Sequence, residues 1–104
     1  MDFKNLGLSD LKVSSYCLGT MTYGETTEED DAHLQINEAV SAGINFIDTA
    51  EMYPTCPIRE ETSGKTEEII GNWIGLNKNK RKEIILATKI VGNGFKYIRD
   101  GGPI

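Results

Sequence analysis

Two apolar runs decide how this chain folds: Ile44-Asn45-Phe46-Ile47, which leads into Asp48, and Glu83-Ile84-Ile85-Leu86-Ala87-Thr88, which leads into Lys89. Short runs that are apolar throughout are typical of strands covered on both faces of a sheet. Tyr53 follows Asp48 by five residues. If the two runs are neighbouring parallel strands, a carboxylate, a phenol and an ammonium converge at one edge of the sheet. Such a group is suited to proton transfer to a carbonyl.

A helical pattern precedes each of the two runs. In the first helix, Thr27 is the expected N-cap, with Asp30 three residues on, and Gly43 is the expected left-handed stop. The second helix is predicted from about Thr66 to Gly75 or Leu76. Apolar residues recur at helical spacing in both segments: Ala32, Ile36, Ala39 and Val40 in the first, and Ile69, Ile70, Trp73 and Ile74 in the second.

Short strands are predicted before the first helix. Residues 4–6 and 11–13 form a hairpin pattern, and residues 16–18 form a short apolar strand that ends at Gly19-Thr20. The alternation of strands and helices predicts an α/β fold with a parallel sheet. Parallel sheets bind ligands beyond the carboxyl ends of their strands. Thr20, Asp48, Tyr53 and Lys89 all stand at or just beyond such ends.

Length and composition limit the classes of protein that fit. A chain of 104 residues makes one domain. The net charge of -5 argues against nucleic-acid binding, which needs clustered Lys and Arg. No run approaches the ~20 apolar residues of a membrane span, and the N-terminus has no signal-peptide pattern. We therefore expect no nucleic-acid or membrane partner and a cytoplasmic location.

The cysteines and the histidine do not suggest a metal or disulfide site. Cys17 and Cys56 are too few for a disulfide framework, and with the single histidine they show no zinc spacing. Cys17 is expected to be a buried small apolar residue, and Cys56 an exposed thiol in a loop. His33 lies among acidic residues and is expected at the surface. No metal site is predicted.

Two other motifs have simpler explanations than a function. Ser63-Gly64-Lys65-Thr66 imitates the end of a P-loop, but Arg59 stands where that motif requires a glycine. Gly64 and Thr66 are more simply a turn and a cap. The basic residues between 78 and 82 are typical of a solvated loop.

Asp48, Tyr53 and Lys89 together could form a tuned acid. A tyrosine hydroxyl has an ordinary pKa of ~10, which is too high for ready proton donation near neutrality. A nearby ammonium favours the phenolate, and a carboxylate would hold that ammonium in place. Hydride would have to come from a cofactor, since no side chain supplies one. Taken singly, each residue also has a structural explanation, as a loop cap, a packing ring or a solvated lysine.

These segments resemble a known family. Leu18-Gly19-Thr20-Met21, the stretch from Gly43 to Tyr53, and Ala87-Thr88-Lys89 resemble the N-terminal part of an aldo-keto reductase. Ala50-Glu51-Met52-Tyr53-Pro54, with Gly71-Asn72-Trp73 downstream, most resembles the Tas branch of bacterial aldo-keto reductases. The resemblance extends from the hairpin to about Val91.

The resemblance implies an incomplete (β/α)8 barrel. Residues 1–14 would form the hairpin that closes its N-terminal end. Residues 15–91 would supply the first three barrel strands with two helices, and residues 92–104 part of an active-site loop. A full barrel needs ~250 residues and eight strands. The chain would therefore be a partial aldo-keto reductase domain.

The resemblance also implies an activity, which is the NADPH-dependent reduction of an aldehyde or ketone. Tyr53 would be the proton donor, Lys89 would make it more acidic, and Asp48 would pair with Lys89. Gly19, Thr20 and Met21, together with Asp48, would lie near the nicotinamide end of NADP(H).

The match to the family is incomplete. The family's fourth catalytic residue is a histidine after the next strand, and its main NADPH contacts lie in the C-terminal half. We therefore expect no turnover by this chain alone. The alternative hypothesis is a fragment or non-catalytic module that assembles with a complementary partner, or with copies of itself through its open sheet edges.

Overall fold

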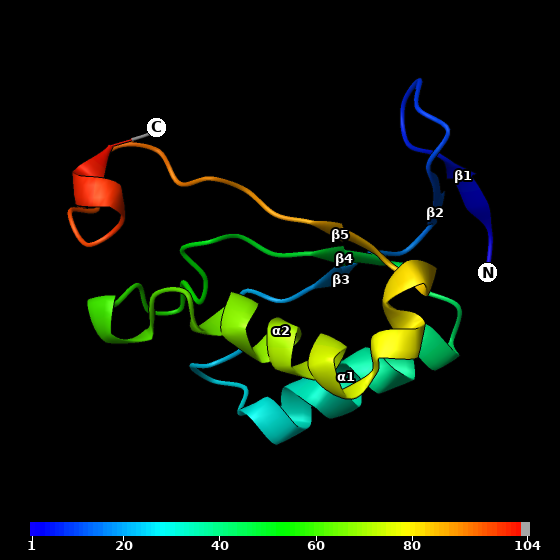
Figure 1. Cartoon of the computed structure of the whole chain (residues 1–104), viewed down its shortest axis with the longest axis horizontal. Helices are drawn as coiled ribbons and strands as arrows, with labels where there is room; N and C mark the ends of the chain where they lie inside the picture. The colour runs from blue at the N-terminus through cyan, green and yellow to red at the C-terminus, as the bar shows by residue number, and fades with distance from the viewer. Residues whose placement is uncertain (103–104) are drawn as a thin grey trace.

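The fold has two helices on one side of a small parallel sheet and a separate hairpin at one end of that sheet (Figure 1). The structure is a computed structural model and describes residues 1–102. Within these residues there are also three short 3-10 helices, at Glu60–Thr62, Lys78–Glu83 and Arg99–Gly101. The regular elements are β1 (Phe3–Asn5), β2 (Lys12–Ser14), β3 (Leu18–Gly19), α1 (Glu29–Ser41), β4 (Phe46–Asp48), α2 (Lys65–Leu76) and β5 (Ile85–Ala87).

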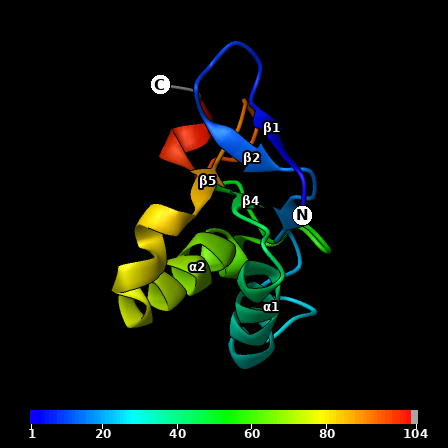
Figure 2. The ribbon, with the colours of Figure 1, turned by 90° about the vertical axis from the view of Figure 1, so that its right-hand side faces the viewer.

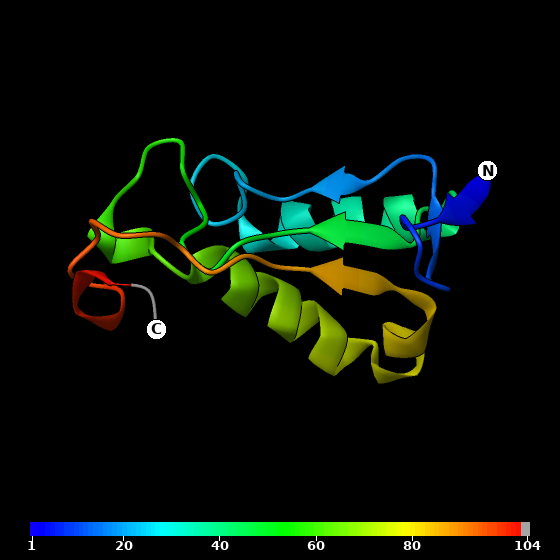
Figure 3. The same cartoon turned by 90° about the horizontal axis from the view of Figure 1, so that it is seen from above.

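The sheet has the order β3-β4-β5, and both strand pairs are parallel. Asp48 stands opposite Gly19 on one side and Ala87 on the other. Each connection between neighbouring strands contains one α-helix, as is usual for parallel strands (Figure 3). The predicted alternation is confirmed, with strand bounds displaced by one or two residues. The carboxyl ends of all three strands therefore meet at one edge, where the predicted site residues lie.

The core lies between the sheet and the two helices (Figure 2). Trp73 is 1% exposed and Ile47 is 0% exposed. The Trp73 indole Nε1 donates a hydrogen bond of 2.8 Å to Asn37 Oδ1, so the buried N–H group is satisfied from α1. The helical spacing read from the sequence therefore identifies the faces that pack. The buried members of the cluster are Tyr23, Ala32, Ile36, Ile47, Ile69, Ile70, Trp73 and Ile84.

The start of α1 differs from the prediction, whereas its end agrees. Glu28 is the N-cap and makes no side-chain capping bond. Thr27, the predicted cap, instead places its Oγ1 3.0 Å from Thr22 Oγ1. The Thr27 hydroxyl is therefore used within the loop before the helix and is not a cap, although its residue type and the spacing to Asp30 favour that role. Gly43 has φ +96 after the helix, as the left-handed stop requires.

The prediction that His33 is a surface residue is wrong. Its side chain is 17% exposed, and Nε2 lies 3.0 Å from the Ile69 carbonyl oxygen of α2 and 3.5 Å from Glu29 Oε2. The acidic residues next to His33 in the sequence suggested that its side chain is exposed to solvent. In the structure, His33 lies on the side of α1 that faces α2. The imidazole therefore links the two helices.

The expectation that the strands are covered on both faces is also wrong for the described residues. Ile47 and Leu86 pack on the helices, whereas Phe46, Ile85 and Ala87 are only half-buried on the opposite face. Cys17, which was expected to be buried, is exposed. No described element covers this face, so its residues keep contact with solvent despite their apolar sequence.

The free edge of β5 carries an apolar groove. The groove has a volume of ≈ 210 Å³ and lies between α2 and the sheet. The hydroxyl of Thr49, which lines it, is buried without a hydrogen-bond partner among the described residues. In the described part of the chain, β3 and β4 are each followed by an α-helix, whereas β5 is followed only by the 3-10 helix Arg99–Gly101. The groove residues are Thr49, Glu67, Ile70, Gly71, Ile74, Leu86 and Thr88.

The hairpin is attached to the sheet through Asn45. Asn45 Oδ1 accepts a bond of 2.8 Å from the Ser14 backbone N–H, and Asn45 Nδ2 donates one of 2.9 Å to the Lys12 carbonyl. These contacts satisfy backbone groups that β2 would otherwise leave unpaired. They hold the hairpin at the amino-terminal end of the strands, away from Asp48. Among residues 1–102, no helix is long and apolar enough to cross a membrane.

Candidate active site

Asp48 and Lys89 form an ion pair at the carboxyl ends of β4 and β5. Lys89 Nζ donates to Asp48 Oδ1 at 2.9 Å and Oδ2 at 2.8 Å, and to the Thr49 carbonyl at 2.7 Å. The hydrogen bond to Asp48 is the main reason why the pKa of Lys89 is raised. Three acceptors use the three donors of the ammonium, so its position is well defined.

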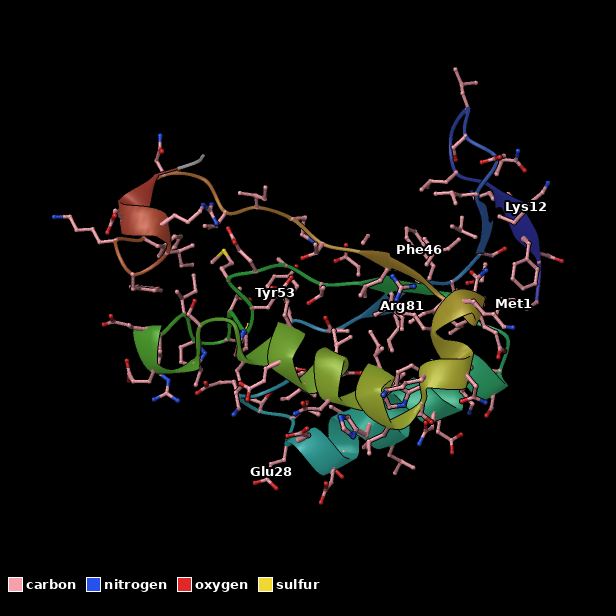
Figure 4. The ribbon with its side chains drawn as sticks, viewed as in Figure 1. Met1, Lys12, Glu28, Phe46, Tyr53 and Arg81 are labelled. Atoms are coloured by element: carbon pink, nitrogen blue, oxygen red, sulfur yellow. The ribbon has the colours of Figure 1, made fainter. Side chains whose placement is uncertain are left out.

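Tyr53 lies beside this ion pair. Lys89 Nζ is 5.1 Å from the centroid of the Tyr53 ring, within range of a cation–π contact. The Tyr53 backbone is held by α2, because its carbonyl accepts bonds from the N–H groups of Gly64 at 3.1 Å and Thr66 at 3.3 Å. Figure 4 shows Tyr53 far from Phe46 and Lys12, which lie toward the other end of the sheet. The predicted convergence of the carboxylate, phenol and ammonium is therefore present in the structure.

An open cleft of ≈ 360 Å³ borders these groups. Thr20 is buried, and its Oγ1 donates a bond of 2.8 Å to the Asp48 carbonyl, so it positions the Asp48 backbone. Met21 is 46% exposed at the rim. Gly19 has no other atom within 4 Å of the point where a Cβ would stand, so that side of the cleft is open. The lining residues are Gly19, Thr20, Met21, Thr22, Asp48 and Tyr53.

The arrangement contains a phenol that can donate a proton, and no histidine lies beside it. His33 is the only histidine of the chain and lies between α1 and α2. Within residues 1–102, no group of three or more His, Cys, Asp or Glu side chains could hold a metal ion. The chemistry available at the cleft is therefore that of a phenol beside a paired ammonium.

Sequence reasoning missed one contact within the site and one ion pair beside it. The Thr49 carbonyl is a third acceptor for Lys89, and it is a backbone atom that carries no sequence signal. Arg99 reaches Glu51 from the segment after β5, where no periodic pattern was visible. Glu51 lies within the Ala50–Pro54 motif that carries the family resemblance, but nothing in that motif predicts its ion pair with Arg99.

The family of the chain follows from comparison with known proteins. The model of the aldo/keto reductase family matches residues 16–102, and the chain belongs to this family. The protein Tas of Escherichia coli is 48% identical over 102 residues, which are 95% of this chain and 29% of Tas. The uncharacterized oxidoreductase YrpG of Bacillus subtilis is 40% identical over 90 residues, which are 86% of this chain and 26% of YrpG. The resemblance to the family and to its Tas branch is confirmed.

Solved structures of the family share the fold. The aldo-keto reductase AKR11C1 from Bacillus halodurans, in its holo form, matches with a TM-score of 0.72 and 38% identity. The match covers 97% of this chain and 29% of that one. A putative aldo-keto reductase from Pseudomonas aeruginosa matches with a TM-score of 0.68 and 31% identity, over 89% of this chain and 32% of that one. The chain thus corresponds to the N-terminal part of a (β/α)8 barrel and spans less than a third of these relatives.

Proposed function

We propose that this chain is the proton-donating part of an NADPH-dependent aldo-keto reductase that acts on a small aldehyde or ketone. One observation carries the proposal. Lys89 Nζ is bonded to Asp48 and stands 5.1 Å from the Tyr53 ring, and both Asp48 and Tyr53 line an open cleft. A general acid needs this combination of a donor, a neighbouring positive charge and access for the substrate.

Each residue of the site has a defined task in the proposal. The Tyr53 hydroxyl donates its proton to the carbonyl oxygen as negative charge develops there. The Lys89 ammonium stabilises the phenolate that remains, through its charge. Asp48 and the Thr49 carbonyl hold Lys89 at the required position. Thr20, directly after β3, positions the Asp48 backbone through the hydrogen bond from its hydroxyl to the Asp48 carbonyl oxygen.

Gly19, Thr20, Met21 and Asp48 would hold the nicotinamide end of NADP(H). The open space beside Gly19 and the exposed Met21 side chain fit a flat, partly apolar ring. When bound, the nicotinamide supplies the hydride. No Lys or Arg is among the described residues that line the cleft, so phosphate contacts would have to come from elsewhere. The use of NADPH enters this proposal through the family resemblance, and the cytoplasmic location through the lack of a signal-peptide pattern in the sequence.

A chimaera tests the proposal directly. Residues 1–102 replace the matching part of the Bacillus halodurans aldo-keto reductase, and NADPH oxidation is followed with 4-nitrobenzaldehyde as substrate. We expect turnover by the chimaera and a loss of at least about 100-fold in kcat with Tyr53→Phe, the size typical of general acid–base catalysis. The isolated chain is expected to show no turnover.

Two controls keep the result interpretable. Circular dichroism and NADPH fluorescence establish that the chimaera folds and binds the cofactor. The variant Leu76→Ala, at an exposed residue on α2, should retain the activity of the chimaera. A folded chimaera that binds NADPH and does not reduce the aldehyde, or whose Tyr53→Phe variant remains fully active, would contradict the proposal.

A second candidate function is assembly. It is favoured by the free edge of β5 and the ≈ 210 Å³ apolar groove beside it. Open edges and apolar grooves bind further strands or helices, from a complementary segment or from copies of the chain. Sedimentation equilibrium over a hundredfold concentration range should show association. A compact monomer throughout would exclude self-association.

A further inference from the structure

A second charged contact lies next to the candidate site and has no part in the chemistry described above. Glu51 accepts hydrogen bonds from the Val91 backbone N–H at 2.8 Å and from Arg99 Nη1 at 2.5 Å. Arg99 Nη2 also donates a bond of 3.2 Å to the Val91 carbonyl. Arg99 therefore spans from the segment after β5 to both the loop after β4 and Val91. Charge-assisted bonds of this kind are among the stronger polar contacts in proteins.

The Glu51–Arg99 contact attaches residues 92–102, a segment with few other contacts to the rest of the protein. After β5, residues 92–102 contain one 3-10 turn, at Arg99–Gly101, and a tilted aromatic pair of Phe95 and Tyr97. The segment meets the loop after β4 where Arg99 binds Glu51. Most of its residues are exposed. Apolar packing is thus too limited to fix the segment in place.

The backbone at the contact is in an unfavourable conformation. Arg99 has φ +47 and Asp100 has φ +55, and neither residue is a glycine. Residues with a Cβ avoid this left-handed region, and two in succession persist only where surrounding contacts impose them. The hydrogen bonds of Arg99 to Glu51 and Val91 are such contacts.

We infer that Glu51 and Arg99 form a latch, which holds residues 91–102 against the loop that carries Tyr53 and thereby positions Tyr53. The inference rests on the proposed function, since it assigns Glu51 and Arg99 as positioning residues for Tyr53. It adds a residue pair that acts through the loop and not on the substrate.

The place of Glu51 in the chain explains how the latch acts on Tyr53. Glu51 stands two residues before Tyr53, and its own backbone N–H donates a bond of 3.1 Å to the Lys89 carbonyl. One residue therefore connects the strand extension that carries Lys89, the loop that carries Tyr53, and the segment after β5. Loss of its carboxylate frees the segment and removes one anchor of the short loop before Tyr53.

The latch is charged at neutral pH. The hydrogen bond from Arg99 is the main cause that lowers the pKa of Glu51, and the Val91 N–H contributes in the same direction. The carboxylate is therefore ionised under ordinary conditions, and the isosteric change Glu51→Gln removes its charge with little change in shape. Glu68→Gln is a matched control, because Glu68 forms an exposed ion pair with Lys65, at 3.5 Å.

Two measurements on the 104-residue chain test the latch. The first is trypsin cleavage after Lys96, which lies within the held segment. We expect cleavage about tenfold faster in Glu51→Gln than in wild type, the size expected for loss of a charged hydrogen bond. Glu68→Gln should be cleaved at the wild-type rate. Arg99→Gln should match Glu51→Gln, and Arg99→Lys should recover part of the protection.

The second measurement reports on Tyr53 itself. With tyrosine labelled by 13C at the ring, the Tyr53 signal is assigned from Tyr53→Phe. It should shift or broaden in Glu51→Gln and in Arg99→Gln, whereas the signal of the exposed Tyr16 should not change. Equal cleavage rates, or an unchanged Tyr53 signal in both variants, would overturn the inference. If Glu51→Gln does not fold, the cleavage rate and the Tyr53 signal of Arg99→Gln are sufficient to test the inference. Neither readout depends on turnover, so failure of the latch and failure of the proposed reductase function are separable.

Discussion

The two faces of the β3-β4-β5 sheet are built from the same three strands and have different environments. The helix side is dry, with Ile47 and Trp73 almost fully buried between the sheet and the two helices. The opposite side carries Phe46, exposed Cys17 and the carboxylate of Asp48, all in contact with solvent.

The alternation of side chains along a strand explains the difference. Ile47 points to the helices, so Phe46 and Asp48 on either side of it point to the opposite face. Burial on the helix side provides most of the stability, while the exposed side leaves the paired Asp48 and Lys89 in contact with solvent. We therefore expect substitutions on the helix side to change stability, and substitutions on the open side to change chemistry.

The largest expected effect is at the centre of the dry face. Trp73→Ala should reduce the free energy of unfolding by about 3–5 kcal/mol, because it removes a buried indole and leaves a cavity. Urea denaturation followed by circular dichroism measures the loss. Leu76→Ala, on the same helix but exposed, should stay within about 0.5 kcal/mol of wild type. Similar values for both variants would remove the distinction between the faces.

A smaller effect is expected from the one hydrogen bond that enters this dry region. Asn37→Ala leaves the Trp73 indole N–H without its acceptor at 2.8 Å. An unsatisfied buried donor costs about 1–3 kcal/mol, to be read from the same urea curves. If Asn37→Ala has the same urea midpoint as wild type, water replaces Asn37 as the acceptor. The helix side of the sheet would then not exclude solvent from the Trp73 indole.

On the open face, removing the ion pair should change stability little. Lys89→Met is expected to cost less than about 1 kcal/mol at pH 7, because exposed ion pairs contribute little. The pKa of Lys89 is raised in the fold. Its contribution is therefore fully present below the unfolded value of about 10.4 and is lost as the pH rises through the folded value.

Thermal unfolding of wild type and Lys89→Met from pH 7 to pH 11 checks this dependence. The difference in Tm between them should shrink only above about pH 10.4, where the lysine of the unfolded chain loses its proton. A difference that is constant across the range would mean that Lys89 stabilises the fold through packing of its hydrocarbon stem.

The smallest expected effect reports on the electrostatics of the open face. Cys17 is exposed, but the protein around it removes part of the water from its thiol, and this partial desolvation is the main cause that raises its pKa; Asp48 also raises it, and Lys89 lowers it. In a Cys56→Ser background, Asp48→Asn should therefore speed the reaction of Cys17 with Ellman's reagent at pH 7, and Lys89→Met should slow it. Changes below about tenfold are expected, since one pKa unit is a tenfold change in thiolate. Unchanged rates would place Cys17 outside the field of the ion pair.

Much of the fold could be predicted from the sequence. Helical spacing identified the packed faces of both helices, and the apolar runs located β4 and β5 to within two residues. Asp48 and Lys89 were predicted to converge because parallel strands bring their carboxyl ends to one edge. These inferences depend on local periodicity and connectivity, both of which are written in the order of residues.

The errors have a shared physical origin. His33 was expected in solvent and Cys17 in the core, because their sequence neighbours are acidic and apolar, respectively. Whether a side chain is covered depends on which element packs against it, and α2 covers His33 while no described element covers Cys17. The contact of Arg99 with Glu51 could not be predicted, because two residues separated by 48 positions show no local sequence periodicity.

The order of residues is enough to predict the strand and helix pattern, the family resemblance and Asp48, Tyr53 and Lys89 as candidates for one site. The folded structure is needed to see which face of the sheet stays open, how Lys89 shares its three donors between Asp48 and Thr49, and that Glu51 binds Arg99. The reason is that periodicity and spacing are properties of neighbours along the chain. Burial and long-range hydrogen bonds depend on neighbours in space.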